Sequence, residues 1–451
     1  MKSYKLIILA VLVMAFSSGC NMKTDSAENL VDKPKYDIDK KSLEDGISKL
    51  LPPNTSFTLP SNSKDVGTIN NVDLNGNGVE EVVAFKKSEN LNENSSNKVG
   101  FMILRKTNDN YSFDDEELID GDSIEYANFY DLNNDGHKEI VILSKSKDKT
   151  TMHIYSYINN KIKKLYTVEP SWIENSENLT DMKIQIGKMD SDGLLDIVMV
   201  NLNPKTNEAY VSVLNFDDTL IHKDTTVFQN VKNISEMYLN IGRVSAKRRG
   251  VVVDIPILKG GYYSTNILYM QNNKIEKAFV DNEIIKPYYI PIRDIDKDKI
   301  LEIPTNDVTY KSKDEANVTW YKWSGRKGYK SFSSQIYYNY KCNYKVLIPN
   351  NLTGKVIVEE ELVNGKNPKT SVFKFYYYDS VDSERKNLFY ITVENKSKID
   401  ESQGKNSHNP ITLKETEDYN YFLTINNIEE TKKLDLTAEV IKDDYFSLIY
   451  E

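Results

Sequence analysis

The sequence predicts a mainly β protein, with a β-propeller of about five four-stranded blades followed by a smaller α+β domain. Three observations support this prediction. An acidic loop motif recurs at nearly constant spacing, short β-branched and aromatic segments surround each copy, and the repeat ends near residue 338. The length of 451 residues suits two or three domains, and the 39% apolar and 28% charged residues are typical of a globular protein.

The N-terminal segment has the pattern of a secretion signal. Two lysines precede an eleven-residue apolar run, which as a helix would reach about 16 Å, roughly half of a bilayer's hydrocarbon core. We therefore expect a signal peptide over residues 1–19, then Cys20 and a polar, flexible tether over residues 20–41. The alternative is an ordinary secretory peptide in which Cys20 has no role.

The SSGC sequence that ends at Cys20 is similar to a bacterial lipobox. This resemblance implies that Cys20 carries a diacylglycerol and that the mature chain begins there. It also implies an extracytoplasmic protein that a lipid anchors to the bacterial cell membrane.

The propeller is expected over residues 42–338. The frame D-x-[DN]-x-[DN]-G-x-x-[DE] and its degraded copies start at residues 73, 131, 188, 243 and 294, and we number these copies loop 1 to loop 5. Four strand-like segments separated by short polar turns accompany each copy, which leaves no room for crossover helices. An open β-sandwich array or two stacked sheets would also hold such strands. We favour a ring because blades in a ring leave only short edges.

The repeated loop has the residue types of a calcium site. Oxygen-bearing side chains at loop positions 1, 3, 5 and 9, with a backbone carbonyl at position 7, would form the all-oxygen shell that calcium requires. The predicted ligands are Asp73, Asn75, Asn77 and Glu81 in loop 1; Asp131, Asn133, Asp135 and Glu139 in loop 2; Asp294, Asp296, Asp298 and Glu302 in loop 5; and, more weakly, Asp190, Asp192 and Asp196 in loop 3. Turn chemistry alone would explain one copy, but recurrence in register favours a structural ion.

The loops differ in how well they fit this chemistry. Loop 2 is the best formed, and loop 1 has only two carboxylates. Loop 5 has four, but Lys299 replaces the turn glycine, which costs on the order of 1 kcal/mol if its φ is positive. Loop 3 begins with Lys188, whose ammonium could replace the charge of a metal. Loop 4, at Arg243, has no ligands.

These loops and their flanking strands resemble FG-GAP or VCBS-type repeats, as in the propeller of integrin α subunits. The chain looks especially like bacterial lipoproteins that carry such repeats behind a lipobox. The resemblance covers about residues 50–335 and implies a calcium-loop propeller without implying a particular ligand.

The repeat does not continue into residues 339–451. We predict that these residues form the α+β domain, with a helix inside 428–443. No catalytic motif occurs, so a binding or scaffolding role at the cell surface is expected, with an envelope protein or a glycan as partner. The alternatives are an enzyme acting on cell-wall polysaccharide and an envelope-assembly factor. The net charge of −9 argues against nucleic acid.

Overall fold

The computed structural model describes residues 46–61, 66–88, 97–107, 110–147, 149–172, 179–257, 261–306, 317–362, 370–380, 383–398 and 410–450. The predicted signal peptide, Cys20 and the tether lie outside these residues. Within the described ranges, no helix combines the length and the apolar character that crossing a bilayer requires.

Five antiparallel sheets follow one another along the chain, and most strands pair with their neighbours in sequence. The first sheet comprises β1 (Thr55–Phe57), β2 (Ile69–Val72), β3 (Glu81–Ser88), β4 (Lys98–Thr107) and β5 (Asn110–Asp120). The second comprises β6 (Ser123–Tyr130), β7 (Glu139–Ser146), β8 (Lys149–Ile158) and β9 (Lys161–Val168), and the third comprises β10 (Asp181–Gly187), β11 (Asp196–Asn203), β12 (Glu208–Asp217) and β13 (Thr219–Gln229).

The fourth sheet comprises β14 (Tyr238–Ser245), β15 (Arg248–Pro256), β16 (Tyr263–Gln271), β17 (Lys274–Lys277) and β18 (Ile284–Lys286). The fifth comprises β19 (Ile303–Thr305), β20 (Asn317–Trp323), β21 (Lys330–Asn339), β22 (Tyr344–Ile348) and β28 (Phe446–Leu448). In the first and fourth sheets, two short strands share one edge: β1 and β2 both pair with β3, and β17 and β18 both pair with β16. These two sheets are therefore still four strands wide.

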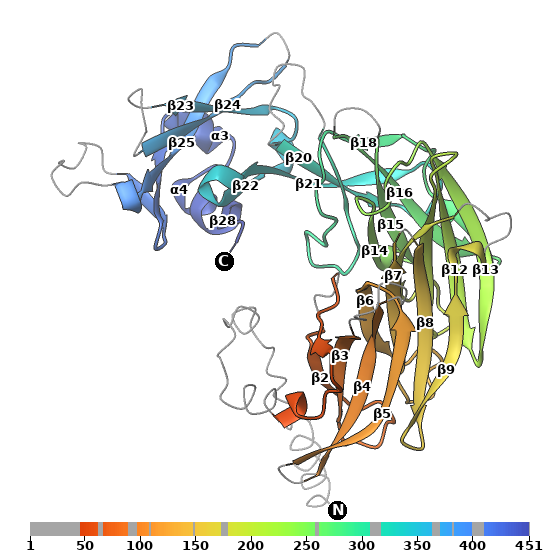
Figure 1. Ribbon diagram of the computed structural model, residues 1–451. Helices are drawn as coiled ribbons and strands as arrows, with labels where there is room; N and C mark the ends of the chain where they lie inside the picture. Colours follow the sequence, from red (N-terminus) through yellow and green to blue (C-terminus); the bar gives the residue numbers. More distant parts are fainter. Residues whose placement is uncertain are drawn as a thin grey trace, which may run out of the picture.

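The sheets pack face to face in a curved row (Figure 1). The second strand of each sheet is buried on both faces; in β7, Ile140 and Ile142 pack toward the first sheet, whereas Val141 and Leu143 pack toward the third. Burial on both faces explains why these strands are continuous apolar runs in the sequence.

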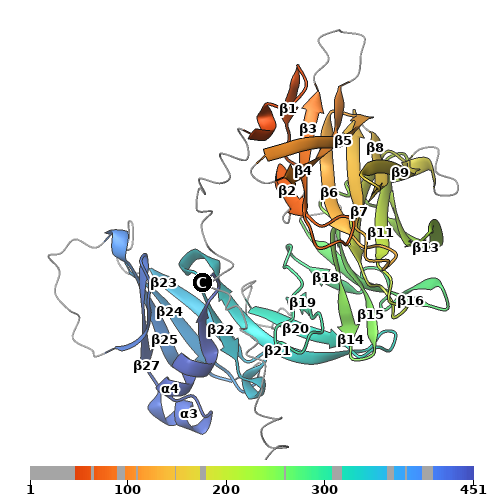
Figure 2. The ribbon, with the colours of Figure 1, turned by 90° about the horizontal axis from the view of Figure 1, so that it is seen from below.

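The first and fifth sheets lie at the two ends of the row, and the described residues do not close it into a ring (Figure 2). The mainly β class and the succession of antiparallel sheets are thus confirmed, while a closed ring is not seen.

A repeated Ile-Gly pair in the first strand, at the end of β10 and within β14, allows close packing of neighbouring sheets. A Cβ atom on Gly187 would lie 2.9 Å from Ile241 Cγ2, and one on Gly242 would lie 2.9 Å from Leu301 Cδ1. Real Cβ atoms do not approach other atoms this closely, so a larger residue at either position would force the Ile241 or the Leu301 side chain to shift.

The C-terminal part adds a sixth sheet and short helices. The sheet has the order β23-β24-β25-β27-β26, formed by Val356–Leu362, Thr370–Tyr377, Lys386–Asn395, Tyr419–Ile425 and Ile411–Glu415. The helical segments are α3 (Ile428–Lys433), α4 (Ala438–Val440) and the π-helical η6 (Ile441–Tyr445), inside and just beyond the range predicted to be helical. Short 3₁₀ turns occur at η2 (Pro170–Trp172), η3 (Tyr340–Cys342), η4 (Asn350–Leu352) and η5 (Lys396–Lys398).

This C-terminal part is joined to the fifth sheet. β22 pairs with β21, and β28, near the end of the chain, pairs with β22. The predicted domain boundary at residue 338 therefore falls near the end of β21, between two hydrogen-bonded strands. One hydrophobic cluster includes residues of β22, the sixth sheet and the helices, so the C-terminal part shares its core with the end of the row.

Candidate functional site: a row of acidic loops

Loops 1, 2, 3 and 5 occupy equivalent places in successive sheets. Loops 1, 2 and 3 join the first strand of their sheet to the second, as β2 to β3, β6 to β7 and β10 to β11. Loop 5 precedes β19, and the bridge between Arg293 and Glu302 takes the place of the first strand. In the fourth sheet, β14 and β15 are joined by a two-residue turn, residues 246–247. This turn fits the expectation that loop 4 has no ligands.

The carboxylate at position 9 is buried in all four loops and accepts a hydrogen bond from the backbone N–H of position 2. The bonds run from Leu74 N to Glu81 Oε2 (3.0 Å), Leu132 N to Glu139 Oε2 (3.0 Å), Met189 N to Asp196 Oδ2 (2.9 Å) and Ile295 N to Glu302 Oε2 (2.7 Å). The recurring bond shows that the spacing read from the sequence corresponds to a repeated three-dimensional structure.

The aspartate at position 1 organises the turn. In loop 2, the two carboxylate oxygens of Asp131 accept hydrogen bonds from the N–H groups of Asp135 and Gly136, each at 3.0 Å. Asp73 in loop 1 and Asp294 in loop 5 accept the equivalent pair of bonds. In loop 5, Lys299 has a φ of 70°, the left-handed conformation in which glycine was expected.

Loop 2 has three carboxylates, of which Glu139 is buried, Asp131 partly buried and Asp135 exposed. Among the described residues, no ammonium or guanidinium group forms an ion pair with Asp131, Asp135 or Glu139. Burial raises the pKa of Glu139 to about 7, and the charges of Asp135 and Asp131 add to this shift. These properties fit a site that a divalent cation would stabilise.

A buried hydroxyl beside Glu139 is consistent with this interpretation. β7 and β8 pair antiparallel with Ile140 opposite Tyr155, so the same register places Ser156 opposite Glu139, with both side chains on one face of the sheet. Ser156 is 4% exposed, and its Oγ has no hydrogen-bond partner. Buried hydroxyls are normally paired, so this oxygen is available to a ligand in loop 2.

Loop 3 contains a lysine ammonium among its carboxylates. Lys223 Nζ lies 3.1 Å from Asp190 Oδ2, 3.0 Å from Asp192 Oδ2 and 2.9 Å from Asp196 Oδ1. The expectation that a lysine could neutralise this loop is therefore met by Lys223 of β13, rather than by the exposed Lys188.

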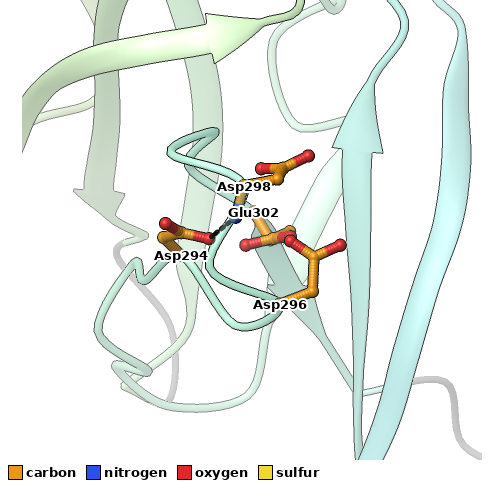
Figure 3. Close-up of side chains that lie close together, drawn as sticks. All are labelled: Asp294, Asp296, Asp298 and Glu302. Atoms are coloured by element: carbon orange, nitrogen blue, oxygen red, sulfur yellow. Dashed lines mark hydrogen bonds between the residues drawn. The ribbon is translucent and has the colours of Figure 1, made fainter. Parts of the chain in front are cut away.

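Loop 5 has a similar arrangement. Its four carboxylate side chains gather in one place (Figure 3), with one oxygen from each within 4.8 Å of the others. Lys322 of β20 forms ion pairs with Asp296 and Asp298, and its Nζ lies 3.6 Å from Glu302 Oε1. Burial raises the pKa of Glu302 to about 7, and the Lys322 ammonium opposes that shift.

Loops 1 and 2 contact each other through their backbones. The N–H of Lys138 donates to Leu74 O at 2.8 Å, and a Cβ atom on Gly76 would lie only 2.5 Å from Gly136 O. In loop 1, Asn75 Nδ2 donates to Glu81 Oε1 at 2.7 Å. A change in the backbone conformation of either loop would therefore displace the other loop.

Most of the tryptophan and tyrosine residues that could contact a glycan lie in the core. Trp320 and Trp323 are each 1% exposed, and Tyr377 and Tyr378 are also buried. Tyr262 is exposed, while Tyr263 contacts Tyr238 and Tyr289 in a partly exposed cluster.

No protein-family model matches the sequence, and no curated protein sequence matches it. Among solved structures, the chain is similar to rhamnogalacturonan lyase YesW, with 12% identity, a TM-score of 0.32 and coverage of 74% of this chain and 67% of that chain. It is also similar to the exotype rhamnogalacturonan lyase YesX, with 10% identity, a TM-score of 0.32 and coverage of 73% of each chain. TM-scores this low support no conclusion about function.

Proposed function

We propose that this chain is a lipid-anchored, extracytoplasmic binding or scaffolding protein that calcium stabilises at loops 1 and 2. The observation that carries the calcium assignment is the state of loop 2: a buried Glu139, two further carboxylates without a cation partner, and the unpaired hydroxyl of Ser156. Calcium would compensate the negative charge of these carboxylates, and it binds oxygen ligands of this kind. The acidic side chains would hold the ion, and its role would be structural.

The position of the loops explains why a structural ion would matter for binding. We interpret the row of five sheets as propeller-like, in accordance with the resemblance to FG-GAP or VCBS-type repeats. Loops 1 and 2 connect the strands that form the first two sheets, and they touch each other at Gly76 and Gly136. An ion that fixes both loops would stabilise the end of the row and any binding surface formed there.

The binding role predicts a calcium-dependent partner. We expect the tagged full-length chain, mixed with cell envelopes and cross-linked, to recover an envelope protein or glycan in calcium and much less of it in a chelator. Asp131→Ala, which keeps only the loop 1 site, should recover less of the partner in calcium than the wild type does, whereas Asp190→Ala should behave as wild type. Equal recovery by all three chains in both conditions would contradict a calcium-dependent binding role.

The lipid anchor is tested separately through Cys20. Cys20→Ala removes the thiol that would carry the diacylglycerol, so we expect the variant to leave the membrane fraction and enter the soluble extracytoplasmic fraction. Cys342→Ala is the matched control, because Cys342 is buried and unpaired in the C-terminal part. If the Cys20→Ala protein stayed with the membrane, lipidation would be rejected.

A further inference from the structure

Two lysines reach acidic loops from different strands, and the strand register shows where each comes from. β12 and β13 pair with a register shift after Val213, where Lys223 is the extra residue of a β-bulge. Lys322 lies on β20 directly opposite Glu302, because Tyr321 pairs with Ile303. A cation can therefore reach a loop from two neighbouring places. One is the extra residue of the β-bulge in the fourth strand, and the other is the residue of the third strand that lies opposite loop position 9.

The same two places exist in the second sheet, but they contain no cation. The bulge between β8 and β9 leaves Leu165 as the extra residue, and Ser156 lies opposite Glu139. Loop 2 therefore has an aliphatic and a hydroxyl side chain where loops 3 and 5 have a lysine in one place or the other. The absence of a cation from loop 2 follows from these two residues.

In the first sheet, the two places contain charges that neutralise each other. The bulge residue is Asp114, and Arg105 occupies the third-strand position. Arg105 Nη2 donates to Asp114 Oδ2 at 2.9 Å, so its guanidinium is engaged outside loop 1. Loop 1, like loop 2, is left without an ion pair to its own carboxylates among the described residues.

The lysines in loops 3 and 5 are held as a metal would be held. Each ammonium contacts three carboxylates, including the buried one at position 9. The Lys223 and Lys322 side chains are only 12% and 20% exposed. These contacts make each ammonium an integral part of its loop.

We propose that Lys223 and Lys322 are built-in cations that take the place of calcium in loops 3 and 5, so that these loops fold without the ion and exclude it. The row is thereby divided into a calcium-responsive end, at loops 1 and 2, and a calcium-independent remainder. The division rests on the proposed calcium sites, but the role of the two lysines can be tested independently of them.

The first test removes each ammonium. Lys223→Met and Lys322→Met keep the aliphatic stem and leave three or four carboxylates without a cation. In the full-length chain, we expect each variant to bind one more calcium ion than the wild type in titration calorimetry. We also expect lower thermal stability in chelator and recovery in about 10 mM calcium. Lys274→Met is the matched control, because Lys274 pairs with Asp224 outside the loops and should gain no calcium site.

The second test installs an ammonium where the structure lacks one. Leu165→Lys places a lysine at the bulge position equivalent to Lys223, and we expect it to abolish calcium binding by loop 2 while the chain remains folded. This variant keeps the inference testable if a lysine-to-methionine chain fails to fold even in calcium.

The outcomes separate this inference from the proposed function. Folded Lys223→Met and Lys322→Met chains that bind no more calcium than the wild type would overturn the built-in cations, even if the wild type binds calcium. A folded Leu165→Lys chain with undiminished calcium binding would do the same. A wild type that binds no calcium, with variants that do, would reject the proposed sites at loops 1 and 2 and support the lysines.

Discussion

Lys286→Met should destabilise the protein by about 3–5 kcal/mol, the usual result of removing one partner of a buried ion pair. Lys286 and Asp254 are both fully buried, and their Nζ and Oδ1 atoms lie 2.7 Å apart. The Lys286 ammonium also donates to Ile290 O at 3.2 Å, which ties β18 to the segment that leads to the fifth sheet. Without the lysine, Asp254 would keep only the hydrogen bond from Thr265 Oγ1.

The measurement is denaturant unfolding of the variant and two controls. Asp254→Val/Lys286→Met removes both charges, so it should recover most of the lost free energy of unfolding. Lys274→Met breaks a surface pair whose lysine side chain is 69% exposed, and it should cost less than about 1 kcal/mol. If the single and double variants lost equal stability, lost packing would explain the effect and the charge argument would fail.

Asp131→Ala should remove the calcium response of loop 2. With a Kd of about 10⁻⁴–10⁻³ M, as in extracellular modules, about 10 mM calcium stabilises a one-site protein by roughly 1.4–2.7 kcal/mol. The aspartate also accepts the N–H groups of Asp135 and Gly136, so the variant loses some stability without calcium. The informative quantity is therefore the difference in the free energy of unfolding between calcium and chelator.

Asp190→Ala is the control for this experiment. It removes a carboxylate that Lys223 contacts, so it lowers stability in both conditions but leaves the calcium response intact. Loss of the same calcium response in both variants would contradict the assignment of calcium to loop 2. Retention of the full response in both would place the ion elsewhere.

The loop geometry could be read from the sequence because it is local. Asp131, Gly136 and Glu139 are separated by fixed numbers of residues, and the turn that joins them is closed by hydrogen bonds within nine positions. Local spacing also located the copy at Arg243 that lacks ligands, and it placed Lys299 at the glycine position of the turn, where the structure has a positive φ. Such features recur whenever the same short sequence is placed between two paired strands.

The cations in loops 3 and 5 could not be read in this way. Lys223 is 33 residues from Asp190 along the chain, and it reaches the loop only because a β-bulge shifts the register by one residue. Lys322 reaches loop 5 because Tyr321 pairs with Ile303, which places the lysine opposite Glu302. A sequence gives the identity of these lysines, but their positions follow from strand register.

Local sequence patterns also do not show whether the row of sheets closes into a ring. The repeat predicts antiparallel units, and their stacking follows from the two buried faces of strands such as β7 and β11. Whether the ends meet depends on the small rotation between each pair of sheets. The pairing of β28 with β22 likewise joins residues about a hundred positions apart, and no spacing rule signals it.

We propose that calcium binds at loops 1 and 2, while Lys223 and Lys322 replace it in loops 3 and 5. The most direct test is titration calorimetry of the wild-type full-length chain with calcium, carried to about 10 mM so that sites in the expected Kd range fill. We expect two bound calcium ions per chain. No binding heat, or four bound ions, would rule out this assignment of the sites.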